Sequence, residues 1–107
     1  MKKIFLFLFL FLCTISLMAN SEPNYQSGKI VNLTAITGGI MIMMDKGLPD
    51  NCVGSPYGWM LIKQEYSAMT SVVIAAWASG KTVGTVYTSG REDGQGYCLV
   101  TQFDPDN

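Results

Sequence analysis

The stretch GWMLIKQEYSAMTSVVIAAWASGKTVGTVYT, residues 58–88, indicates the fold class, because its hydrophobic period changes twice. Residues 58–63 are a short apolar run that is typical of a strand. From Glu65 to Ser79 the apolar residues recur at helical spacing. This stripe consists of Tyr66, Met69, Val73 and Trp77. Gly80 stands where helices commonly end, and residues 81–88 alternate as a strand does. The stretch therefore predicts a strand, a helix and a second strand.

Strand patterns flank this stretch on both sides. Before it, residues 28–36 and 40–44 are rich in apolar and β-branched residues, and the glycines of residues 37–39 signal a tight turn. Residues 45–57 contain prolines and glycines and are expected to form a loop. After it, a polar glycine-rich turn leads to a last strand over residues 97–103. Alternation predicts one shared face for Tyr97, Leu99, Thr101 and Phe103.

The predicted order is three strands, one helix and two strands, which makes the chain mainly β with one helix. Five short strands with a helix between the third and the fourth are the layout of the OB-fold, a partly open five-stranded barrel. We expect this domain to span residues 28–103. An α+β sandwich, with one helix on an antiparallel sheet, is the alternative.

The first nineteen residues have the build of a secretory signal peptide. Lys2 and Lys3 form a positive start, residues 4–18 are apolar, and Ala19 is a small residue at which a peptidase can cut. Cleavage after Ser21 fits as well. A membrane anchor is the alternative, but a spanning helix needs roughly 20 apolar residues, and residues 4–18 number fifteen.

We therefore expect residues 1–19 to be removed and the chain to be exported, to the periplasm or out of the cell, with no membrane span left. Residues 20–27 are expected to be a flexible lead-in, and residues 104–107 a short tail. Cleavage leaves 107 − 19 = 88 residues, enough for one domain with a thin core.

Cysteine usage agrees with export. Cys13 leaves with the signal peptide, so Cys52 and Cys98 remain. An even pair in an exported domain favours a disulfide, and no CxxC spacing suggests redox work. We predict a structural bridge that ties the loop after the second strand to the fifth strand. Closing a loop of this length is worth about 4 kcal/mol in the chain-entropy model.

Charge and composition exclude several functions. Without the signal peptide, five basic residues face eight acidic ones, and this net charge of −3 argues against nucleic-acid binding. The chain has no histidine, which excludes Ser-His-Asp and Cys-His catalysis and histidine-ligated zinc. The acidic pairs Glu92–Asp93 and Asp104–Asp106 lie in a turn and in the tail, where we expect them to be solvated. We therefore expect no enzymatic activity, no metal and no cofactor.

Other patterns have structural explanations. Residues 79–82 (SGKT) match the end of a phosphate-binding loop, but they follow a helix instead of opening one, so they indicate a helix stop. Met41 and Met43 are expected to pack in the core of a hairpin rather than bind a soft metal. Four aromatic residues, Tyr57, Trp59, Tyr87 and Tyr97, are of the type that carbohydrate sites use, although most aromatics in so small a domain pack in its core.

Two segments carry a resemblance to a known family. Residues 25–30 (YQSGKI) and residues 75–86 (AAWASGKTVGTV) are similar to the B subunit of the subtilase-type AB5 toxins and its small exported relatives. The resemblance implies an OB-fold subunit in a pentameric ring, with the central helices lining the pore and the outer face binding surface glycans. The toxin subunit uses a serine and tyrosines near the start of strand one, which correspond to Tyr25 and Ser27 here.

Two hypotheses about function follow. The first is an exported, non-enzymatic binding module that forms a homo-oligomer and recognises a glycan or a protein partner. The second is a periplasmic protein-interaction or inhibitor protein with no glycan role.

Overall fold

The computed structural model describes residues 23–106 of the chain. The expected signal peptide, residues 1–19, lies outside the described residues, as do residues 20–22 of the expected lead-in. The described elements are, in order, β1 (Tyr25–Ile36), β2 (Gly39–Met44), η1 (Asp50–Cys52), η2 (Pro56–Gly58), β3 (Met60–Lys63), α2 (Ser67–Ala78), β4 (Val83–Arg91), η3 (Glu92–Gly94) and β5 (Cys98–Pro105). This order confirms the predicted succession of three strands, a helix and two strands.

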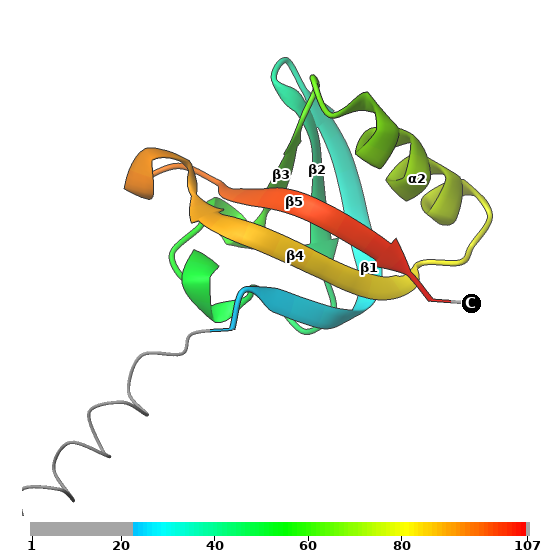
Figure 1. Ribbon diagram of the computed structural model, residues 1–107, viewed down its shortest axis with the longest axis horizontal. Coiled ribbons are helices and arrows are strands. Elements are labelled where there is room, and N and C mark those ends of the chain that lie inside the picture. Colours follow the sequence, from blue (N-terminus) through cyan, green and yellow to red (C-terminus); the bar gives the residue numbers. More distant parts are fainter. Residues whose placement is uncertain (1–22, 107) are drawn as a thin grey trace, which may run out of the picture.

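The strands form a closed barrel in the order β1-β2-β3-β5-β4 (Figure 1). All neighbouring pairs are antiparallel except β3 and β5, which run parallel. The long β1 pairs with two strands: its first half pairs with β4 and its second half with β2. Its register with β2 shifts after Ile30. This closed ring with one helix between β3 and β4 fits the OB-fold and not the sandwich.

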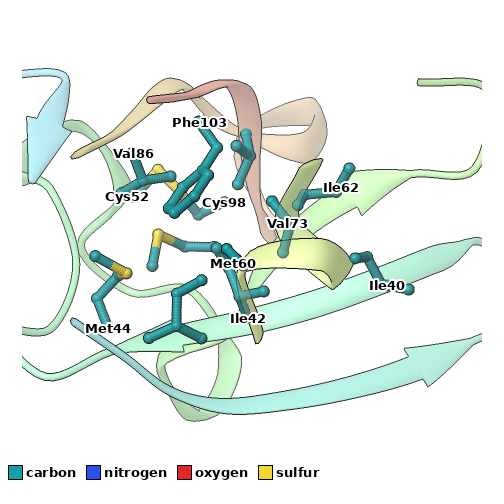
Figure 2. Close-up of a cluster of buried hydrophobic side chains, with 13 residues drawn as sticks. Ile40, Ile42, Met44, Cys52, Met60, Ile62, Val73, Val86, Cys98 and Phe103 are labelled. Carbon is teal, nitrogen blue, oxygen red and sulfur yellow. A yellow bond between two sulfur atoms is a disulfide. The ribbon is translucent and has the colours of Figure 1, made fainter. Parts of the chain in front are cut away.

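The core fills the inside of the barrel (Figure 2). Ile42, Met60, Ile62 and Val86 are each fully buried in it. Hydrophobic residues of β1, β2, β5 and α2 and Cys52 of η1 complete the cluster. Met44 and Met60 lie in the core, whereas Met41 is buried outside the core cluster and Met43 is partly exposed. The expectation of core packing is therefore wrong for Met43, which is not in the core cluster, whereas Met41 is buried.

Helix α2 covers the barrel with a narrower stripe than predicted. Val73 and Ala76 are buried and Met69 packs against the core, whereas Tyr66 is 46% and Trp77 40% exposed. The predicted stripe was therefore wrong at both ends. Tyr66 precedes the first helical residue, Ser67, and the buried line runs from Met69 through Val73 to Ala76 instead of to Trp77.

The predicted face of β5 was also wrong. Cys98 and Val100 point into the core, and the inward side then shifts to Phe103. The shift occurs because Thr88 pairs with Val100 and its neighbour Tyr87 pairs with Gln102, which leaves Thr101 unpaired as a bulge. One extra residue moves all side chains after it to the other face.

Two strand boundaries extend beyond the predicted domain. β1 begins at Tyr25, so residues 25–27, expected in a flexible lead-in, pair with β4 and belong to the barrel. β5 continues to Pro105, because Asp104 and Pro105 pair with Thr85 and Gly84. The expected tail is correspondingly shorter.

The predicted disulfide is present between Cys52 and Cys98, at a sequence separation of 46 residues. Both cysteines are fully buried. Beside it, Ser55 Oγ accepts a hydrogen bond from the Cys98 N–H (2.9 Å) and donates one to the Trp59 carbonyl (2.6 Å). The loop between β2 and β3 is thus fastened to the start of β5. No helix between residues 23 and 106 is long and apolar enough to cross a membrane.

Removing the disulfide should strongly destabilise the domain. The double variant Cys52→Ala/Cys98→Ala is expected to lose about 4 kcal/mol of unfolding free energy, because the unfolded chain is no longer cross-linked. Urea denaturation followed by tryptophan fluorescence measures this loss. The reduced wild-type protein is the control and should unfold at nearly the same urea concentration. A loss below about 1 kcal/mol would contradict a structural role for the bridge.

The turn between β1 and β2 offers a second test. Gly39 has φ 149°, and a Cβ there would collide with the Ile62 carbonyl oxygen. Gly39→Ala should therefore cost about 2–4 kcal/mol. Gly38→Ala is the matched control, since its Cβ would meet nothing within 4 Å. Equal midpoints of thermal unfolding for the two variants would contradict the expected close approach of β2 and β3.

Candidate ligand-binding surface

Tyr25 and Ser27, the two residues expected to bind ligand, lie side by side with residues of β4. Tyr25 pairs with Tyr87 and Ser27 pairs with Thr85. The tyrosine ring centroids are 6.2 Å apart at an interplanar angle of 40°, and the Ser27 and Thr85 hydroxyl oxygens are 2.8 Å apart. All four side chains point to the outside of the barrel, since the β4 residues that alternate with Thr85 and Tyr87, Val86 and Thr88 among them, are buried.

The next strand extends these two rows. Tyr87 pairs with Gln102 and Thr85 pairs with Asp104 on β5, and both β5 residues are exposed on either side of buried Phe103. Directly opposite residues of antiparallel strands share a face. The result is one surface, which we name the β1–β4–β5 patch. It consists of Tyr25, Ser27, Thr85, Tyr87, Gln102 and Asp104.

A buried hydrogen-bond network holds the edge of this patch. Thr88 is 2% exposed, and its hydroxyl is 2.6 Å from Asn51 Oδ1 and 3.2 Å from the Asn24 carbonyl. The Asn51 amide donates in return to the Thr88 carbonyl (3.0 Å), and the Thr88 N–H donates to the Asn24 carbonyl (2.8 Å). Thr88 therefore binds both Asn24, the residue just before Tyr25, and Asn51 of η1.

The patch combines aromatic rings with hydrogen-bonding groups. Tyrosine rings present an apolar face with a polar hydroxyl at the end, and hydroxyl, amide and carboxylate groups fix the orientation of a polar ligand. Tyr25 is 52% exposed, so its ring is open to a ligand. The paired hydroxyls of Ser27 and Thr85 and the carboxylate of Asp104 add donors and acceptors in the second row. This arrangement offers stacking and hydrogen-bonding groups to a polar ligand.

The sequence alone pointed to two of the six residues of the patch, and it noted Tyr87 only as one aromatic among several. Thr85 and Gln102 were missed, and Asp104 was expected in a solvated tail. Alternation along β4 signals that Thr85 and Tyr87 share a face. The β5 residues follow the β5 bulge, so their face could not be read from alternation.

The acidic residues of the β4–β5 turn do not form a paired-carboxylate site. Glu92 lies 4.0 Å from Lys63 Nζ in an ion pair whose two side chains are 39% and 35% exposed, and Asp93 is exposed. Among residues 23–106, no three histidine, cysteine or acidic side chains are grouped so that they could hold a metal ion.

Comparisons with known proteins identify no relative. No family model matches the chain, and neither a curated protein nor a solved structure matches it.

The hydrogen-bond network gives a prediction for the patch. Thr88→Val keeps the shape of the side chain but removes its hydroxyl, which leaves Asn51 Oδ1 without its buried donor. Unfolding free energy should fall by about 1–2 kcal/mol, and hydrogen exchange should accelerate at residues 24–27. Ser89→Ala, one position along the same strand and exposed, is the control and should change stability by less than about 0.5 kcal/mol. Unchanged exchange in Thr88→Val would contradict this role.

Proposed function

We propose that this chain is an exported, non-enzymatic binding module that acts as a homo-oligomer and recognises glycans through the β1–β4–β5 patch. The fold and the position of Tyr25 and Ser27 agree with the resemblance to AB5 toxin B subunits. The six patch residues supply stacking rings and hydrogen-bonding groups in two rows. Those are the chemical requirements of a site that binds a sugar without transforming it.

The exposed apolar surface of α2 is the observation that supports oligomerisation. The helix SAMTSVVIAAWA contains no charged residue, and Val72, Ile74 and Trp77 are 41%, 45% and 40% exposed. A helix that is apolar on all sides is normally buried, and an exposed apolar surface of this kind marks an interaction site. In this chain the barrel covers only one side of the helix.

A second copy of the chain is the partner that fits α2 best. The helix offers no charge for an oppositely charged partner to match, and Ala68, Ala75 and Ala78 permit close approach of a like helix. A helix of twelve residues is about 18 Å long and about 10 Å wide, so one face covers about 180 Å², well below the roughly 800 Å² that each partner buries in a stable complex. Each subunit therefore needs more than one such contact, as in a ring where every subunit has two neighbours.

The protein-interaction hypothesis is the alternative, because the same apolar helix could bind a different protein. The two differ in what the isolated protein does. A ring-forming subunit associates when pure, whereas an inhibitor or accessory protein stays monomeric until its partner is present. A pull-down from envelope extract that returns one stoichiometric partner favours the second hypothesis.

Oligomerisation should depend on α2. The purified protein is expected to elute and sediment as a pentamer, and Ile74→Glu should convert it to monomer, because a buried charge without a partner is costly. Val53→Glu is the matched control, since Val53 is 71% exposed in the β2–β3 connection. A monomeric wild-type protein, or the same loss of association in both variants, would overturn this part of the proposal.

Glycan binding should depend on the β1–β4–β5 patch. On a glycan array, Ser27→Ala and Tyr87→Ala should weaken binding at least about tenfold, because they remove a hydroxyl pair and a stacking ring. Tyr57→Ala is the control, because Tyr57 is a tyrosine that is 89% exposed in η2 and lies outside the patch. A folded protein that is silent on the array would contradict the glycan part of the proposal.

A further inference from the structure

A hollow lies on the outer side of β3, apart from the β1–β4–β5 patch. Its volume is about 350 Å³. The β1–β2 turn, the segment after β3 and the β4–β5 loop border it (the last is orange in Figure 1). The side chains that line it include Leu61, Lys63, Gln64, Glu65, Glu92 and Tyr97.

The floor of the hollow is apolar. Leu61 points outward, since its neighbours Met60 and Ile62 lie in the core, and it pairs across the strands with Met41. Leu61 and Met41 are nevertheless only 5% and 4% exposed. The β4–β5 loop reaches this face of the barrel, where Glu92 approaches Lys63. A nearly buried apolar base with polar walls is the usual build of a small-molecule site.

The walls carry groups that suit hydroxyl-rich ligands. Lys63 Nζ and Glu92 Oε1 are 4.0 Å apart, and both side chains stay more than a third exposed, so each keeps free hydrogen-bonding capacity. Gln64 adds an amide, and the partly buried Tyr97 adds an aromatic ring. Glu65 and Glu92 together outweigh Lys63 by one negative charge, which disfavours an anionic ligand.

The loops around the hollow are held in place before any ligand binds. Arg91 Nε donates to the Gly96 carbonyl (3.0 Å), and its Nη2 donates to the Gln95 carbonyl. The Glu92 N–H donates to the Tyr97 carbonyl (2.7 Å). Across the hollow, the Gln64 N–H donates to the Gly38 carbonyl in the β1–β2 turn (3.0 Å). Such preorganisation lowers the entropic cost of binding.

We propose that this hollow is a second ligand site, specific for a neutral saccharide and independent of the β1–β4–β5 patch. The ring of Tyr97 contacts the C–H face of one sugar, above the nearly buried side chain of Leu61. Glu92 accepts hydrogen bonds from sugar hydroxyls, Lys63 donates to them, and Gln64 does both. The location agrees with the general use of strands 2 and 3 and their neighbouring loops for ligands in OB-folds. A nucleic acid would need the positive surface that is missing here.

Saturation-transfer NMR on the intact purified protein tests the site. The probes are neutral mono- and disaccharides of glucose, galactose, mannose and N-acetylglucosamine, with sialyllactose as the anionic comparison. At least one neutral probe should bind, and sialyllactose should not compete for the hollow. Glu92→Gln and Tyr97→Ala should each weaken that binding at least tenfold. Asp93→Asn is the matched control, because Asp93 neighbours Glu92 in the same turn without lining the hollow, and it should bind as the wild type does.

The outcomes separate this site from the patch. Loss of neutral-sugar binding in Glu92→Gln, with Ser27→Ala unaffected, supports the second site even if the patch binds nothing. Loss in Ser27→Ala, with Glu92→Gln unaffected, overturns the second site and leaves the proposed patch standing. A folded protein that binds no neutral probe, or an equal loss in Asp93→Asn, also overturns it. Glu92→Gln keeps the size of the side chain, so a failure of Tyr97→Ala to fold does not weaken the test.

Discussion

Closure of the barrel between β3 and β5 depends on a short parallel contact. Met60 pairs with Cys98 and Leu61 pairs with Leu99, and parallel pairing is slightly weaker per residue than antiparallel pairing. The Cys52–Cys98 disulfide stands at this contact and ties the β2–β3 connection to the first residue of β5. A domain of this size has a thin core, so the covalent link there supports both the ring of strands and the loops that border it.

The same link shapes the outer surfaces of the barrel. Tyr97 and the β4–β5 loop come just before Cys98, so the disulfide anchors one wall of the hollow on β3. The β1–β4–β5 patch lies on neighbouring strands of the ring other than β2 and β3. The hydrogen bond between Thr88 and Asn51 holds its edge. Helix α2 offers a third surface that shares no residue with either. The proposed self-association through α2 would therefore leave both proposed ligand sites exposed.

Prediction from the sequence succeeded where the signal is local and failed where it depends on neighbours. The order of strands and helix followed from hydrophobic periodicity, and the cysteine pair followed from counting. The face that Phe103 was predicted to share with Leu99 and Thr101 was wrong, because the unpaired Thr101 shifts the register. The ends of the helix stripe, Tyr66 and Trp77, were also wrong, because periodicity reports apolar spacing and not how much of a helix its neighbour covers. For the candidate site, the sequence could not show that Gln102 and Asp104 lie on the same surface as Tyr25, because this depends on the pairing of the strands.

By itself, the sequence determined the types and order of the elements, the cysteine pairing and the lack of histidine chemistry. These properties depend on composition and on spacing within short segments. Only the tertiary structure decided which side of each strand faces outward and which residues become neighbours across strands. The physical reason is that register and bulges arise when the ring of strands closes, and closure joins segments as distant as Ser27 and Thr85.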